Sequence, residues 1–347
     1  MTLNFCTLFD SNYLSRGLAL LQSLKTVSDN FHLYVAAFDD DCLAYLKSLN
    51  DKDLTAISLA EFENQPLLEV KKGRTPAEYC WTCTPFLIAY CIENYHLPSC
   101  IYLDADMIFY ENPQILLSEL NDASVLITEH RFTREYDVSE THGIYCVQFM
   151  YFKNDDKGLK ALYWWRDRCL EWCFAYLEDG KFGDQKYLDD WTTRFEGVHV
   201  LKNPGGGLAP WNVQQFDVAE KEQEITITDK NGNHSRLVFF HFHGVKFYSD
   251  ETVECCGALY GIDESAKKIL YFPYFRDLLQ IGDKVSMSGF PRNPHGAQNP
   301  SPAPEKILIN YIRDVIFLIG KGKTSLFNGR IYNFSLHRHL YKLRQFK

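Results

Sequence analysis

Two carboxylates, Asp104 and Asp106, follow directly on the apolar run 101–103. Such a run predicts a buried strand, and side chains two residues apart on an extended chain project to the same side. Two carboxylates held together repel each other unless a cation joins them, and hard divalent cations take oxygen ligands. The spacing therefore indicates a divalent-cation site at a strand end, with a solvated acidic turn as the alternative.

A second polar group follows another apolar run, 239–240. His241 and His243 are two residues apart, Gly244 lets the backbone approach a ligand closely, and Lys246 adds a positive charge. Imidazole, carboxylate and ammonium groups together suit a metal-bound diphosphate, and the imidazole favours Mn²⁺ over Mg²⁺. The alternative interpretation is two ordinary histidines at the end of a strand.

Alternating strand and helix patterns predict how these groups are positioned. We expect strands at residues 4–9, 31–38, 55–59, 100–103, 124–128 and 145–152, helices at 13–24, 76–94 and 158–177, and a hairpin joining 224–228 to 237–242. Thr75 and Glu78 form a capping box at the start of the second of these helices. This alternation predicts an α/β fold with a mainly parallel sheet flanked by helices, in which ligands bind at the carboxyl ends of the strands.

The charge along the chain is uneven. The whole chain of 347 residues has a formal net charge of -9. Residues 301–347 carry nine Lys and Arg against two Asp and Glu, so the preceding 300 residues carry -16. We expect one domain over 1–285, a Pro- and Gly-rich linker over 286–305, and a basic, helical C-terminal tail over 306–347. The acidic body argues against a nucleic-acid partner.

The basic tail has two interpretations. Its apolar residues and flanking cations suit an anionic membrane surface, or they suit a helix packed on the acidic body. Eleven cysteines without a recognisable secretory leader predict reduced, buried structural thiols, including the Cys80-x-x-Cys83 pair. We therefore expect a cytoplasmic protein. If the basic tail binds a membrane surface, we expect peripheral attachment to the inner face of the membrane.

The two motifs in this order resemble those of GT-A-fold nucleotide-diphospho-sugar glycosyltransferases, most closely glycosyltransferase family 8. The segment 102–106, Tyr-Leu-Asp-Ala-Asp, is similar to the Tyr-Leu-Asp-x-Asp signature of that family. The segment 241–246 is similar to its His-x-x-Gly-x-x-Lys signature, with one residue fewer before the lysine. The resemblance covers most of residues 1–246. It departs at Trp81, where the family usually has an arginine.

The resemblance implies roles for residues at the matching positions. It implies a metal site at Asp104, Asp106 and His241. It also implies donor binding by Thr7, Phe9, Asp10, Tyr13, Asp104, Ala105, Asp106, Gly244 and Lys246, with Tyr13 as the ring that stacks on the base. Asp184 and Gln185 resemble the family's Asp-Gln element beside the reacting carbon of the sugar. A helix N-cap is the alternative role for Asp184.

The activity implied is transfer of a sugar from a nucleotide-diphospho-sugar, first of all a UDP-sugar, to a saccharide or lipid-linked glycan acceptor. The cofactor implied is Mn²⁺ or Mg²⁺, and retention of the anomeric configuration is the expected outcome. Polysaccharide or lipopolysaccharide synthesis is the expected setting. Two alternatives stay open, namely a catalytically silent GT-A binding domain and an Asp-x-Asp phosphohydrolase.

Overall fold

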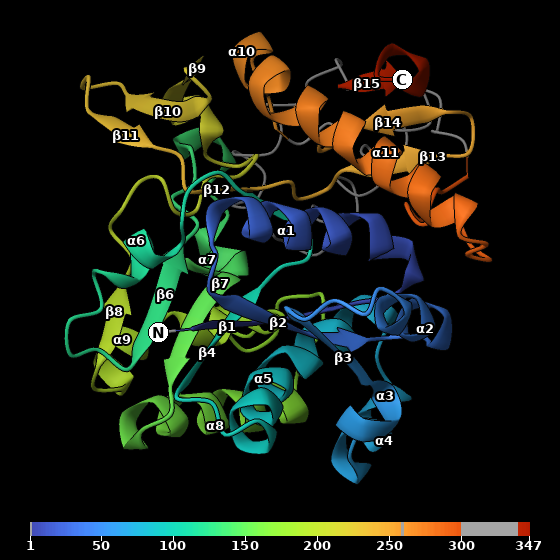
Figure 1. The fold of residues 1–347 in the computed structure, drawn as a ribbon. Helices are drawn as coiled ribbons and strands as arrows, with labels where there is room; N and C mark the ends of the chain where they lie inside the picture. The colour runs from blue at the N-terminus through green and yellow to red at the C-terminus, as the bar shows by residue number, and fades with distance from the viewer. Residues whose placement is uncertain (1, 258–259, 300–338) are drawn as a thin grey trace, which may run out of the picture.

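The computed structural model describes residues 2–257, 260–299 and 339–347 (Figure 1). Its central sheet has seven strands in the order β3-β2-β1-β4-β7-β6-β8. These strands are β1 (Leu3–Phe9), β2 (Phe31–Ala37), β3 (Leu54–Ser58), β4 (Ser99–Leu103), β6 (Val125–Glu129), β7 (Tyr145–Lys153) and β8 (Val198–Val200). Neighbouring strands run parallel except where β7 pairs with β4 and with β6. The predicted α/β class with a mainly parallel sheet is confirmed.

Helices cover both faces of the sheet (Figure 1). One face carries α1 (Leu14–Val27) and α11 (Phe272–Met287), and the other carries α5 (Pro76–Asn94) and α8 (Asp156–Glu171). The shorter helices are α2 (Asp40–Ser48), α3 (Leu59–Phe62), α4 (Gln65–Lys71), α6 (Gln114–Leu117), α7 (Ser139–His142), α9 (Trp191–Arg194) and α10 (Glu264–Ala266). Along β1 the side chains alternate between the two cores, with Phe5 on the α1 side and Cys6 on the α5 side. This strand is buried on both faces, as expected within a helix-covered parallel sheet.

Local capping explains where α5 begins. The Thr75 side chain accepts from the Glu78 backbone N–H, the Glu78 carboxylate accepts from the Thr75 backbone N–H, and Pro76 occupies the first turn. The predicted helix 158–177 ends earlier, at Glu171. Trp172 adopts an extended backbone and its ring packs edge-on against Phe174.

Two strands outside the main sheet connect the sequence motifs. The strand β5 (Met107–Phe109) pairs antiparallel with β12 (Phe239–His241). A separate ribbon contains β9 (Phe216–Lys221), β10 (Glu224–Asp229) and β11 (His234–Arg236). The prediction of a hairpin between 224–228 and 237–242 is therefore wrong in its second strand. The apolar residues 237–240 are fully buried in the core rather than exposed on the two-sided ribbon.

The C-terminal part of the described chain lies against the body. The segment 292–298, within the expected linker, contacts α1 and α2, since the Ser15 N–H donates to the Pro294 carbonyl at 3.0 Å and Arg292 pairs with Asp41 at 2.6 Å. Residues 340–342 form β15 (Leu340–Lys342), which pairs with β14 (Thr252–Glu254) beside β13 (Lys246–Tyr248). The predicted tail is thus a strand, not a helix, over these residues. Its portion 306–338 lies outside the described residues.

Over the described ranges, none of the helices combines the length and the apolar character needed to cross a bilayer.

Candidate functional site

Pairing of β5 with β12 joins the acidic motif to the histidine motif. In the ladder His241 lies opposite Met107, and the Phe242 N–H donates to the Asp106 carbonyl at 2.8 Å. The Nε2 atom of His241 lies 3.0 Å from Asp106 Oδ1 and 3.7 Å from Asp104 Oδ2. The structure therefore brings together the three residues that the sequence suggests as metal ligands.

The charges of this cluster act strongly on one another. Burial opposes ionisation of Asp106, but His241, and more weakly His243 and Arg16, bring the pKa of Asp106 to about 2. Burial and the neighbouring Asp106 charge raise the pKa of Asp104, although His241 acts against them. Burial lowers the pKa of His241, but the Asp106 carboxylate outweighs it and raises that pKa well above the usual range. A proton on His241 thus balances charge that a bound cation would otherwise balance.

Two further residues orient these ligands. The Nδ1 atom of His241 lies 2.8 Å from the amide oxygen of Gln148, a fully buried residue of β7. Because an amide oxygen only accepts, Nδ1 carries the proton when the ring is neutral, and Nε2 then presents its lone pair to the carboxylates. The Tyr102 hydroxyl donates to Asp104 Oδ1 at 3.1 Å. Sequence reasoning missed Gln148, since its inward direction depends on the register of β7.

The loop after β1 forms the other side of the site. Tyr13 is 40% exposed, and the Arg16 guanidinium lies 4.4 Å from its ring centroid. Asp10 accepts from the Asn12 backbone and side-chain amides and thereby holds the loop. An exposed ring on an ordered loop can stack on a nucleobase.

Three other predicted donor-binding residues are buried. Thr7 and Phe9 lie within β1, and the Phe9 ring belongs to the core, where Gly17 leaves room for it. Ala105 is also buried, between the two carboxylates in sequence. The Phe9 side chain is therefore directed into the core, and its neighbour Asp10 is the first residue of the strand end with an accessible side chain.

The segment after β12 carries the expected glycine and lysine. Gly244 has φ of +82°, and a Cβ there would lie 3.4 Å from the Cα of Cys256. The positive φ favours glycine, and the nearby Cys256 backbone is in ordinary van der Waals contact. Lys246 begins β13 with an exposed side chain, and within the part of the chain that the structure describes no carboxylate forms an ion pair with it. Lys246 is therefore a cation available to an anionic ligand.

Asp184 and Gln185 lie on the loop that follows α8. Asp184 is buried, and burial, followed by the charge of Asp104, raises its pKa well above the usual range. Its side chain makes no capping hydrogen bond to the short helix η3 (Gln185–Leu188). Gln185 Nε2 donates to the His142 carbonyl at 2.7 Å. Asp184 therefore lies close enough to Asp104 for the two carboxylates to act on each other.

Cys146 of β7 lies beside His241 in this cluster, whereas Cys80 and Cys83 lie on α5. Cys83 is buried and Cys80 partly buried, and burial raises the pKa of the Cys80 thiol to about 12. These are not activated redox thiols, because reactivity requires the thiolate. Cys6, Cys91 and Cys100 have sulfur atoms within 4.8 Å of one another inside the apolar core.

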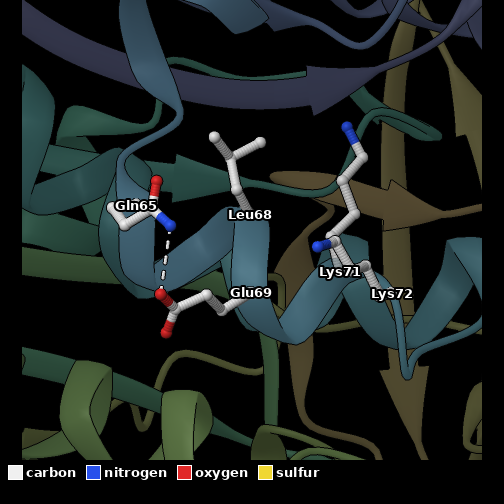
Figure 2. Close-up of a pocket in the computed structure, with 5 residues that line it drawn as sticks. All are labelled: Gln65, Leu68, Glu69, Lys71 and Lys72. Atoms are coloured by element: carbon white, nitrogen blue, oxygen red, sulfur yellow. Dashed lines mark hydrogen bonds between the residues drawn. The ribbon is translucent and has the colours of Figure 1, made fainter.

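An open hollow runs along α4 (Figure 2). It is lined by Gln65, Leu68, Glu69, Lys71 and Lys72. Gln65 donates to Glu69 at 3.1 Å and Lys71 pairs with Glu63 at 2.5 Å, so these polar groups satisfy one another. The hollow contains none of the predicted site residues.

Solved structures with a related arrangement include glycosyltransferases at low similarity. The galactosyltransferase LgtC, in complex with donor and acceptor sugar analogs, is 13% identical, with a TM-score of 0.40 over 60% of this chain and 76% of that chain. Mouse xyloside xylosyltransferase 1 is 13% identical, with a TM-score of 0.40 over 60% of this chain and 87% of that chain. Likenesses at this level assign no activity to this chain.

Two proteins of Bacillus subtilis strain 168 are similar in sequence, whereas no protein-family model matches the chain. The uncharacterized protein YfnD is 29% identical over 297 residues, which are 84% of this chain and 93% of YfnD. The uncharacterized protein YfnF is 34% identical over 257 residues, which are 72% of this chain and 84% of YfnF. This chain therefore belongs to the same protein family as YfnF.

Proposed function

We propose that the chain is a metal-dependent GT-A glycosyltransferase that moves a sugar from a nucleotide-diphospho-sugar to a saccharide or lipid-linked glycan acceptor. A UDP-sugar is the first donor to test. The observation that carries the proposal is the convergence of His241 Nε2 on the Asp104 and Asp106 carboxylates. The position supports it, because ligands of α/β sheets bind beyond the carboxyl ends of the strands.

The ligand atoms suit a divalent cation. Two carboxylates and one imidazole nitrogen form a mixed oxygen and nitrogen set, which favours Mn²⁺ over Mg²⁺. The Gln148 amide oxygen holds the imidazole with Nε2 toward the carboxylates, as a supporting residue does in many metal sites. When bound, the cation would supply positive charge for the diphosphate leaving group.

The chain's own residues have distinct parts in this proposal. Tyr13 stacks on the base, while the Gly244 backbone and the Lys246 ammonium bind the diphosphate and stabilise the charge that develops there. Asp184 and Gln185 border the sugar. The bond between the anomeric carbon and the diphosphate breaks, the acceptor oxygen bonds to that carbon, and the acceptor proton passes to the diphosphate. The family resemblance implies retention of configuration.

The first experiment measures ligand binding and turnover together. UDP with Mn²⁺ is expected to raise the melting temperature, and a chelator is expected to remove that rise. Among nucleotide sugars, at least one is expected to be hydrolysed only with Mn²⁺. Asp106→Asn should abolish this hydrolysis, while the exposed Asp122→Asn serves as a matched control with unchanged turnover.

The outcomes separate the competing functions. Binding of UDP with no hydrolysis or transfer of any nucleotide sugar would identify a silent binding domain. Absence of a thermal shift with every nucleoside diphosphate would refute the donor site itself. Release of phosphate from simple phosphate esters, without sugar transfer, would favour the phosphohydrolase.

The basic tail is proposed to hold the enzyme at an anionic membrane surface near a lipid-linked acceptor. Deletion is a poor test, because residues 292–298 and β15 contact the body. Charge reversal of Lys321, Lys323 and Arg330 to Glu is expected to abolish sedimentation with phosphatidylglycerol vesicles. Equal sedimentation of wild-type and variant protein with anionic vesicles would contradict this attachment.

A further inference from the structure

Arg16 of α1 is a buried cation that pairs with no carboxylate among the described residues. It is 3% exposed, and its guanidinium donates instead to main-chain carbonyls. Nη1 donates to Asn12 at 3.3 Å and to His295 at 3.0 Å, and Nη2 donates to Val245 at 2.8 Å. Because arginine stays protonated in proteins, this site holds a permanent positive charge that the protein balances only in part.

These three carbonyls belong to three separate segments of the candidate site. Asn12 precedes Tyr13 in the loop after β1, and Val245 lies between Gly244 and Lys246. His295 belongs to the segment 292–298 that lies against α1, and its ring stacks on Phe247 at 4.4 Å. One guanidinium thus links the loop proposed for the base with the segment proposed for the diphosphate.

Two polar atoms beside this link have no hydrogen-bond partner in the described structure. One is Arg16 Nε, and the other is the hydroxyl of Tyr274 on α11, whose side chain is 2% exposed. The Tyr274 ring stacks on Phe242 with centroids 3.8 Å apart, directly before the predicted diphosphate segment. Buried polar atoms nearly always have a hydrogen-bond partner. Because Arg16 Nε and the Tyr274 hydroxyl come from different helices and both lack one, their surroundings favour an anionic ligand nearby.

We propose that Arg16 is a positioning residue for the diphosphate of the donor. Its hydrogen bond fixes the Val245 carbonyl, and with it the peptide group that joins Val245 to Lys246 beside the ligand. Its charge adds to the positive field at the same place. The inference rests on the proposed donor site, but it concerns the phosphates and leaves the base to Tyr13.

The test compares UDP with uridine, because the two differ only in the diphosphate. Calorimetric titrations in Mn²⁺ buffer measure both affinities for the wild-type chain, Arg16→Met and Arg16→Lys. We expect Arg16→Met to weaken UDP binding about tenfold or more beyond any change in uridine binding, as loss of charge-assisted hydrogen bonds would do. Arg16→Lys keeps the positive charge but lacks the forked set of guanidinium N–H donors, and it is expected to lose less UDP affinity than Arg16→Met.

Arg131 provides a matched control for a merely structural role. It also donates to three loop carbonyls, those of Leu201, Asn203 and Gly206, and no predicted ligand group lies among them. Arg131→Met should lower the melting temperature without changing the ratio of UDP to uridine affinity.

Equal losses of UDP and uridine affinity in both Arg16 variants, or no loss of either, would overturn the inference while UDP binding by the wild type stands. If Arg16→Met does not fold, the ratio of UDP to uridine affinity in Arg16→Lys tests the inference by itself. Wild-type protein that binds no UDP would overturn the donor site and this inference together.

Discussion

The imidazole of His241 is held between Gln148, 2.8 Å from Nδ1, and Asp106, 3.0 Å from Nε2. One hydrogen bond thus selects which ring nitrogen faces the carboxylates. Supporting residues of this kind typically contribute about 10- to 100-fold to metal affinity. The orientation of His241 therefore depends on a residue of β7 that shares no sequence motif with it.

Gln148→Leu is expected to weaken Mn²⁺ binding about 10- to 100-fold, since the imidazole is then free to rotate or change tautomer. Direct titration of Mn²⁺, followed by electron paramagnetic resonance of the free ion, measures this affinity. Gln215→Leu is the control, because Gln215 donates to the Arg131 carbonyl outside the cluster. Unchanged Mn²⁺ affinity in Gln148→Leu would show that His241 needs no such support.

Six of the seven strands of the main sheet could be predicted from the sequence, but β8 and the smaller pairings could not. Apolar runs such as 31–38 and 145–152 predict buried strands because both faces of the sheet are covered. The capping box at Thr75 fixes where α5 begins. No local sequence pattern indicates the pairing of β5 with β12, because both strands are short and come from distant parts of the chain. Only the family resemblance placed His241 beside Asp106.

The buried positions of Arg16 and Gln148 could not be predicted from the sequence for a related reason. Each lies inside a regular element, where a polar residue normally indicates a solvent-facing position. Both are nevertheless buried, because the 292–298 segment covers Arg16 and the β7 register turns Gln148 inward. Tertiary contacts of this kind are not encoded in the local periodicity.

Gly244→Ala is expected to reduce UDP binding as well as stability. The alanine would need φ near +82°, which residues with a side chain rarely adopt, so the backbone of the proposed diphosphate segment would be strained. A non-glycine residue in this region costs about 1–2 kcal/mol. Gly289→Ala is a matched control, since Gly289 has φ of +84° and open space around it. Both variants should lose stability on urea unfolding, and only Gly244→Ala should lose UDP affinity. Full UDP affinity in Gly244→Ala would exclude close backbone contact with the ligand.

Glu78→Gln is expected to destabilise the chain in a pH-dependent way. The Glu78 carboxylate accepts from Thr75 and also from the Ala175 N–H of the loop that leads to Asp184. Burial opposes ionisation, but these hydrogen bonds prevail and lower the pKa of Glu78. The stability it contributes is thus present above the unfolded pKa of about 4.3 and is lost as the pH falls through the lower folded value.

At pH 7, Glu78→Gln should cost about 1 kcal/mol, in line with other capping interactions. The difference from the wild type should begin to shrink below the unfolded pKa of about 4.3 and vanish below the lower folded pKa, where both side chains are neutral. Urea unfolding at pH 7 and pH 3.5 measures this. Glu61→Gln is the matched control, because Glu61 forms a similar capping box with Ser58 but has no bond to a distant loop. An equal loss at both pH values would rule out the charge of Glu78 as the cause.

Phe346→Ala is expected to destabilise the body, because this ring closes the end of the chain over α11. Phe346 is 9% exposed, and its ring lies 5.3 Å from those of Phe272 and Phe275. Removal of a buried phenyl ring typically costs about 3–5 kcal/mol, and this partly peripheral position favours the lower end. Leu340→Ala, at a position 36% exposed on β15, should cost far less. Urea unfolding of both variants provides the comparison. If the two variants cost the same, the Phe346 ring does not stabilise the body as a buried side chain would.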